Sequence, residues 1–214
     1  MLHGVLDPQP GQLAFALFDG NKLLGKKVCI MQPRDASNLP LFVEESLAEC
    51  GYSLQDVHHW TFGAGPGSFT FLRVVSALGA GWAAANVDFH FRCVPGALAM
   101  AKNLDLSEGE RGGVIYDGRN KEILFFGVEK RNGELLASGE NRIIPGSDGA
   151  KFFAEHKIKL AAFAKDSAVL RGYLGEEIDL LVEEADLSAF IESRDAFDND
   201  ADKMNYIRPA VAGA

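Results

Sequence analysis

Short apolar runs separated by turn residues occupy the beginning of the chain. The runs cover residues 5–7, 12–18 and 22–31, and they are separated by Pro8-Gln9-Pro10-Gly11 and by Asp19-Gly20-Asn21. Short runs with alternating character are typical of strands, and Asp-Gly between two of them is a strong hairpin signal. The pattern therefore predicts three strands in an antiparallel meander.

Between residues 39 and 50 the apolar positions recur at intervals of three and four. This spacing predicts an amphipathic helix that ends near Gly51, with Pro40 tolerated in its first turn and Ser37 or Asn38 able to cap its start. The apolar members of the pattern are Leu39, Phe42, Val43, Leu47 and Cys50.

A glycine-rich loop follows an apolar run over residues 57–62. It leads into Ser68-Phe69-Thr70-Phe71-Leu72-Arg73 and then into small and apolar residues up to Ala85, which predicts a strand, a tight loop and a helix over 68–85. Helix N–H groups and the helix dipole favour an anion at such a junction, whereas a sharp turn with Ser68 capping the helix explains the same residues. The residues of the motif loop and candidate anion site are Gly65, Pro66, Gly67, Ser68 and Thr70.

The predicted order of strands and helices in the second half of the chain repeats that of the first half. After an expected strand over 89–94 and a short helix over 97–104, the polar, glycine-rich segment 107–113 has the composition of a linker. The later elements that we predict are strands at 114–116, 123–129, 134–144 and 160–164, helices at 148–156 and 188–194, and a solvated acidic loop at 195–202. Two meanders followed by helices and strands predict a duplicated α/β architecture, with lobes 1–108 and 109–214.

Charge and composition exclude several classes of function. The chain has 214 residues and a formal net charge of -9. This charge argues against the chain binding nucleic acid on its own, because neutralisation of phosphates is the main source of affinity for nucleic acid. No apolar run approaches the roughly 20 residues that span a membrane, and the N-terminal residues do not read as a secretion signal, so we expect a cytoplasmic protein without a membrane contact. Cys29, Cys50 and Cys93 lie in apolar contexts, which favours buried small side chains over disulfides, zinc or a nucleophile.

The loop also resembles a family signature. Residues 65–73 are similar to the Gly-Pro-Gly-Ser-Phe-Thr-Gly-Leu-Arg motif of the Gcp-like (glycoprotease-like) family, in its TsaB (YeaZ) branch. The opening Val5-Leu6-Asp7 with Asp19-Gly20, and the ending Tyr206-Ile207-Arg208-Pro209, resemble two further places in that family. The resemblance therefore spans the chain, and residues 65–73 are its most specific part.

The resemblance implies an actin-like, Hsp70-like ATPase (ASKHA) fold of two ribonuclease-H-like lobes, each with a mixed sheet and flanking helices. It also implies a non-catalytic scaffold or dimerisation subunit in threonylcarbamoyl transfer to adenosine 37 of tRNA. Such a subunit pairs with a TsaD-like catalytic subunit, assembles with a TsaE-like ATPase and contacts tRNA only indirectly. A homodimer is a further expectation, because an exposed apolar helix pair binds a copy of itself when its partner is absent. The residues assigned to the partner interface are Leu39, Phe42, Val43, Leu47, Phe69, Phe71, Arg73, Gly79 and Trp82.

Two places depart from the family pattern. Asp7-Pro8-Gln9-Pro10 stands where the family has an Asp followed by hydroxyl residues, and prolines lack the N–H groups that a phosphate needs. Phe71 replaces a glycine of the motif. Its ring either fills the space of a ligand or partner, or contacts the partner itself.

A second hypothesis is an ATP-binding phosphotransferase or ATPase with ATP or ADP as its cofactor. Asp7 and Asp117 each end the first strand of a meander, where kinases of this fold class hold hydrated magnesium, although an Asp there also simply opens a turn. His58 and His59 point to opposite faces of a strand, and the sequence contains no His-x-x-x-His pair. We therefore expect neither a metal site nor a catalytic residue in this chain.

Overall fold

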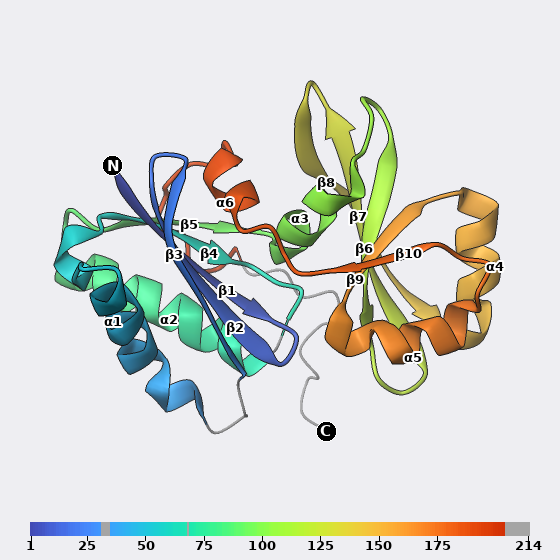
Figure 1. Cartoon of the computed structure of the whole chain (residues 1–214), viewed down its shortest axis with the longest axis horizontal. Helices are drawn as coiled ribbons and strands as arrows, with labels where there is room; N and C mark the ends of the chain where they lie inside the picture. The colour runs from blue at the N-terminus through green and yellow to red at the C-terminus, as the bar shows by residue number, and fades with distance from the viewer. Residues whose placement is uncertain (31–34, 68, 204–214) are drawn as a thin grey trace. The chain divides into compact units, whose positions relative to one another are not determined.

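The computed structural model describes residues 1–30, 35–67 and 69–203, and the chain divides into two compact units (Figure 1). Unit 1 comprises Met1–Gly96 and a returning segment that starts at Leu187, and unit 2 comprises Ala97–Asp186. The chain thus crosses between units after Gly96 and again after Asp186, whereas the sequence suggested one boundary near residue 108. Ser68 and the C-terminal motif at 206–209 lie outside the described residues.

Unit 1 contains a five-stranded sheet in the order β3-β2-β1-β4-β5. Its strands are β1 (Leu2–Gln9), β2 (Gln12–Asp19), β3 (Lys22–Ile30), β4 (His59–Gly63) and β5 (His90–Val94). The first three form the predicted antiparallel meander, and β4 and β5 run parallel to β1. The expectation that Pro8 ends the first strand is wrong, because β1 continues to Gln9 and Pro8 pairs with Leu13 of β2. The strand β4 pairs with β1 only as far as Leu6, so the missing N–H of Pro8 removes no hydrogen bond to β4.

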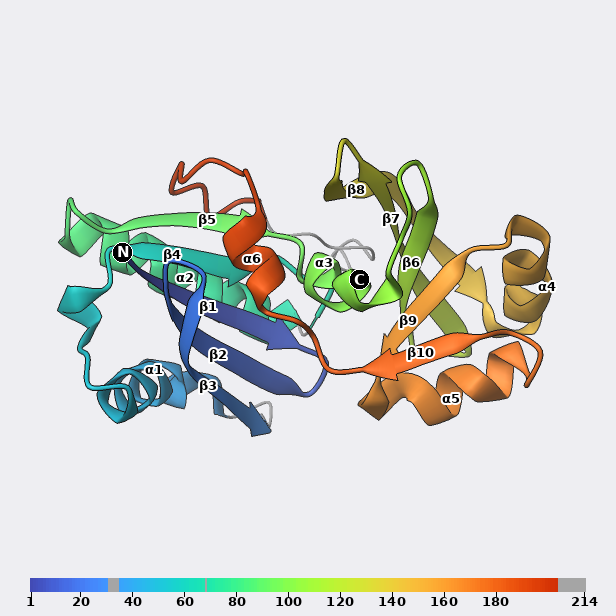
Figure 2. The ribbon, with the colours of Figure 1, turned by 45° about the horizontal axis from the view of Figure 1, so that its top comes forward.

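Helices cover both faces of this sheet (Figure 2). They are η1 (Asp35–Asn38), α1 (Leu39–Glu49), η2 (Leu54–Asp56), α2 (Phe69–Ala85) and α6 (Ser188–Glu192). The apolar sides of α1 and α2 pack on one face of the sheet, around fully buried side chains such as Phe15, Trp60 and Phe62. Asn38 precedes α1 as predicted, but its side chain makes no capping hydrogen bond, because the helix continues from the 3-10 turn η1.

Unit 2 repeats this topology. It contains α3 (Gly96–Ala101, which begins at the last residue of unit 1), η3 (Lys102–Leu104), β6 (Arg111–Asp117), β7 (Glu122–Arg131), β8 (Glu134–Pro145), α4 (Gly146–His156), β9 (Lys159–Phe163), α5 (Ala164–Leu174) and β10 (Leu180–Glu183). The sheet order is β10-β9-β6-β7-β8, again a meander extended by two parallel strands. The duplication is therefore confirmed, and it includes α5 and β10, which the sequence pattern did not indicate.

Candidate functional site

The glycine-rich loop after β4 is shaped by backbone contacts. Gly65 has a φ of 88°, a conformation that favours glycine, and the Gly65–Pro66 peptide bond is cis. A Cβ on Gly67 would overlap the carbonyl oxygen of Pro8, and the N–H of Gly96 donates to the carbonyl oxygen of Gly65 at 2.8 Å. These contacts account for two glycines of the motif, and the anion site proposed for the loop stays a prediction.

The loop closes over a buried acid at the end of β1. Asp7 is 1% exposed, and its Oδ2 accepts a hydrogen bond from Nε2 of Gln9 at 2.9 Å. Nε2 of Gln12 in turn donates to Oε1 of Gln9 at 2.7 Å. A Cβ on Gly63 would overlap Oδ1 of Asp7, and a Cβ on Gly96 would come within 2.7 Å of it. Burial raises the pKa of the Asp7 carboxyl group to about 6, against a smaller opposing effect of the Gln9 hydrogen bond.

These residues do not fit a nucleotide phosphate. Pro8 and Pro10 supply no N–H donors, and the Asp7 carboxyl group is enclosed rather than open to a hydrated ion. In unit 2, Asp117 is half-buried, and its Oδ1 accepts the N–H of Arg119 at 2.9 Å, as expected for an Asp that opens a turn. The N–H of Asp117 donates to Asp166 at 3.2 Å, a residue that the sequence did not single out. Burial raises the pKa of Asp166.

Most of the residues that the sequence assigned to a partner interface are used inside unit 1. Leu39, Phe42, Val43, Leu47 and Phe71 are each at most 9% exposed. A Cβ on Gly79 would overlap the ring of Phe62, and the Trp82 ring lies 5.4 Å from that of Trp60. Arg73 is exposed, and the side chain of Phe69 lies outside the described part of the structure. A direct role of these residues in partner binding stays a prediction.

The opposite side of α2 is exposed and nearly free of side-chain bulk. Most of its exposed positions recur at intervals of three and four, and they are Thr70, Arg73, Ala77, Ala80, Gly81, Ala84 and Ala85. A Cβ on Gly81 would meet no described atom within 4 Å, in contrast to Gly79. On the neighbouring helix α1, Leu41 is 55% exposed. The two glycines of α2 thus differ in what requires them. Close packing against the Phe62 ring of the sheet requires Gly79, whereas it does not require Gly81.

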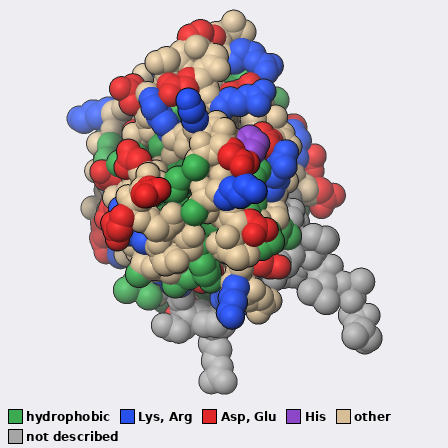
Figure 3. Space-filling model, turned by 90° about the vertical axis from the view of Figure 1, so that its right-hand side faces the viewer, with side chains coloured by type: hydrophobic (Ala, Val, Ile, Leu, Met, Phe, Trp, Pro, Cys, Tyr) green, Lys and Arg blue, Asp and Glu red, His purple; other side chains and the backbone are tan. Residues whose placement is uncertain are grey.

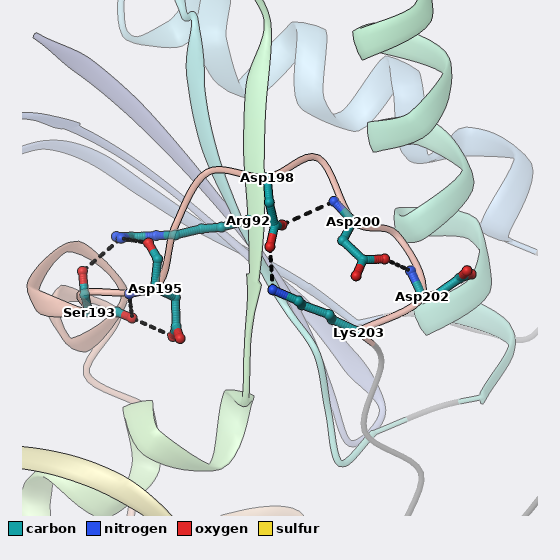
Figure 4. Close-up of polar contacts among 7 residues, drawn as sticks. All are labelled: Arg92, Ser193, Asp195, Asp198, Asp200, Asp202 and Lys203. Atoms are coloured by element: carbon teal, nitrogen blue, oxygen red, sulfur yellow. Dashed lines mark hydrogen bonds and ion pairs between the residues drawn. The ribbon is translucent and has the colours of Figure 1, made fainter.

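Arg92 of β5 holds the returning segment, which we define as residues 187–203, against the sheet of unit 1 (Figure 4). The side chain is 4% exposed, and its Nε donates to Oγ1 of Thr61 at 2.9 Å. Its terminal nitrogens donate to the carbonyl oxygens of Phe190, Ser193 and Asp195 at 2.5, 2.7 and 2.9 Å. Sequence reasoning missed this residue, although a charged side chain within an apolar strand was a signal.

Further contacts continue along the acidic part of the returning segment. Asn199 accepts the N–H of Phe91 with its Oδ1 at 2.6 Å and donates its own N–H to the carbonyl oxygen of Phe91 at 3.0 Å. Ser76 of α2 donates to the carbonyl oxygen of Ala201 at 2.8 Å. The predicted acidic loop at 195–202 is thus irregular and largely exposed as expected, but it is also attached to β5 and α2.

The described residues contain no group of three or more His, Cys, Asp and Glu side chains arranged to hold a metal ion. Cys93 is buried, and Cys29 and Cys50 are half-buried free thiols. No helix in the described ranges has the length and apolar character needed to cross a bilayer. On the face of unit 2 that Figure 3 shows, basic and acidic side chains are interspersed.

Comparisons with known proteins agree with this architecture. The family model described as TsaD, tRNA N6-adenosine threonylcarbamoyltransferase, matches residues 30–188. An uncharacterized protein with similarity to peptidase YeaZ and YeaZ itself, both from Pseudomonas aeruginosa, are each 19% identical to this chain, with TM-scores of 0.67 and 0.64. Each match covers 89% of this chain and 88% of the other.

A more distant solved structure has a similar fold. A Porphyromonas gingivalis protein assigned as an N-acetylglucosamine kinase is 9% identical with a TM-score of 0.50, over 90% of this chain and 97% of the other. No curated protein matches this chain in a sequence search. With the duplicated sheets, these similarities show the two-lobed actin-like (ASKHA) fold that the family resemblance implied.

Proposed function

The chain belongs to the TsaD (tRNA N6-adenosine threonylcarbamoyltransferase) family as a TsaB-like member, and we propose that it is a non-catalytic subunit that binds a TsaD-like catalytic subunit through α2. In this role it supports threonylcarbamoyl transfer to tRNA without contacting the reacting groups. A TsaE-like ATPase joins the same assembly, and tRNA is contacted only indirectly.

The observation that carries this proposal is the exposed side of α2. Over 77–84 its outward positions are Ala77, Ala80, Gly81 and Ala84, so that a second helix can approach the backbone closely. Glycine within a helix costs about 1 kcal/mol relative to alanine. A Cβ on Gly81 would meet nothing within 4 Å in the described part of the structure, so packing there does not require a glycine. Contact with a partner helix is a physical reason for its presence.

The placement of the histidines supports a structural use of this chain rather than a catalytic one. His3, His59 and His90 are register neighbours on the parallel strands β1, β4 and β5. The ring of Phe197, from the returning segment, lies 5.4 Å from His3 and 5.0 Å from His59. The rings of His3 and His59 thus pack against an aromatic side chain of the same protein, Phe197.

Binding and reconstitution test the proposal together. The wild-type chain and an Ala80→Arg variant would be compared for co-purification with the TsaD-like subunit of the same organism and for restoring tRNA modification by that subunit. Ala80 is exposed, so the variant should fold, while its long charged side chain blocks close helix packing. We expect affinity to fall by at least about 100-fold, which corresponds to about 2.7 kcal/mol.

Ala168→Arg on α5 is the matched control, because it places the same side chain at an exposed alanine of unit 2. It should bind and restore modification like the wild type. Sedimentation of the chain alone should show a homodimer that Ala80→Arg weakens, since an unoccupied small-residue surface can pair with a copy of itself. Wild-type affinity and activity in Ala80→Arg would contradict the proposed surface, and failure of the wild-type chain to co-purify would contradict the proposed function.

A further inference from the structure

The carboxyl ends of the parallel strands of unit 1 meet at the side chain of Asp7. Leu6 of β1 is the register partner of Phe62 on β4, so Asp7 stands beside Gly63, and Gly96 follows shortly after the end of β5. Oδ1 of Asp7 occupies the space that a Cβ on Gly63 would need and lies 2.7 Å from the place of a Cβ on Gly96. One carboxyl group therefore fills the gap between Gly63 at the end of β4 and Gly96 at the start of α3.

We propose that Asp7 is a positioning residue, whose buried carboxyl group fixes the loop 63–67 and thereby the start of α2, the helix that binds the partner. The part of this inference that concerns the partner rests on the proposed function. The part that concerns the loop does not, because it follows from contacts within unit 1.

The loop is attached to its surroundings at both sides of this carboxyl group. The N–H of Ala64 donates to the carbonyl oxygen of Val94 at 2.7 Å, and Gly67 lies against the carbonyl oxygen of Pro8. These attachments lie within 64–67, immediately before the first turn of α2. A change in the size of the Asp7 side chain therefore alters the loop from which α2 starts.

The shape of the side chain explains the choice of an acid at a buried position. A carboxyl group is planar, so it fits between two backbone surfaces that lack Cβ atoms, whereas a branched apolar side chain is thicker. Gln9 fixes its orientation by donating to Oδ2. An amide has the same planar shape, so Asp7→Asn should preserve the fit and Asp7→Ala should leave a void.

A double-mutant cycle of Asp7 and Gly63 tests the packing between them. Gly63→Ala introduces a methyl group into the position of Oδ1, and Asp7→Ala removes that oxygen. We expect each single variant to lower affinity for the TsaD-like subunit by about 10-fold, and the double variant to recover most of this loss, because contacting residues are not additive. Asp7→Asn should stay within about threefold of the wild type, while Gly172→Ala, whose Cβ meets nothing within 4 Å, should leave affinity unchanged.

Hydrogen exchange of the free chain separates this inference from the proposed function. In Asp7→Ala, amides over 63–75 should exchange at least about 10-fold faster, with exchange in unit 2 unchanged and with protection restored in Asp7→Asn. Wild-type exchange in Asp7→Ala, or strictly additive effects in the cycle, would overturn the positioning role. If the wild-type chain bound no catalytic subunit, the proposed function would fail, and the exchange experiment would still decide the role of Asp7.

Discussion

Replacement of Arg92 by leucine should detach the returning segment from the rest of unit 1. The guanidinium group donates three hydrogen bonds to carbonyl oxygens of this segment, at Phe190, Ser193 and Asp195, and it lies 4.5 Å from the centroid of the Phe197 ring. Leucine keeps much of the apolar stem and supplies no donor. The carbonyl oxygens then regain hydrogen bonds only when the segment separates from β5 and contacts water.

The size of the effect follows from these contacts. Hydrogen bonds from a charged donor contribute about 1.5–3 kcal/mol each, so the three bonds to the segment have a gross value of about 5–9 kcal/mol. Burial of the guanidinium group opposes this value and lowers the pKa of Arg92. Because the freed carbonyl groups also regain water when the segment separates, we expect the free energy of unfolding to fall by less than this gross value, by about 3–5 kcal/mol.

Urea unfolding followed by tryptophan fluorescence measures this loss, since Trp60 and Trp82 are the two tryptophans of the chain and both belong to unit 1. Thiol labelling in a Cys29→Ser, Cys50→Ser background measures detachment directly. Cys93 is 6% exposed, and burial raises the pKa of its thiol to about 12, with smaller contributions from carboxylates of the segment. Arg92→Leu should therefore accelerate labelling at least about 10-fold, as expected for local opening.

Arg171→Leu is the control, because it removes an arginine that donates to the carbonyl oxygen of Leu180 within unit 2 and leaves the returning segment intact. It should not change the labelling of Cys93. The reasoning about Arg92 would be refuted by a loss below about 1 kcal/mol together with unchanged labelling of Cys93 in Arg92→Leu.

Two further predictions concern pH and packing in unit 1. Burial, and to a lesser degree the charges of Arg92 and His59, lower the pKa of His3 from 6.5 to about 3, so the unfolded state takes up this proton first as pH falls. The stabilising contribution of His3 is therefore complete above pH 6.5 and is lost between pH 6.5 and 3, by about 1.4 kcal/mol per pH unit. The unfolding free energies of the wild type and of His3→Gln should therefore converge as the pH falls through this range. A difference between them that stays constant would contradict the assignment. Gly79→Ala should destabilise the protein by about 1–3 kcal/mol, because the new methyl group meets the Phe62 ring. Gly81→Ala should instead stabilise it by up to about 1 kcal/mol through helix propensity. Urea unfolding of both variants measures these changes, and equal effects would refute the packing argument.

Local chemistry made much of the fold predictable. The Asp19-Gly20 turn indicated the β2–β3 hairpin, and the spacing of Leu39, Phe42, Val43 and Leu47 indicated α1, because each signal involves residues close in sequence. By contrast, α5 buries only Asp166, Leu170 and Leu174, and β10 has four residues, so neither produces a clear periodicity. The structure shows that they complete the duplication, since β9 and β10 repeat the arrangement of β4 and β5.

The sequence by itself determined the duplicated fold, the family resemblance and the glycine-rich loop, because these depend on local periodicity and on residue types at fixed spacing. Only the tertiary structure distinguished Gly79, which packs on Phe62, from Gly81, which is open to solvent. It alone placed Asp7 between Gly63 and Gly96, since these residues meet only when the parallel strands align. Contacts between residues far apart in the sequence depend on strand register and helix packing, which no local pattern specifies.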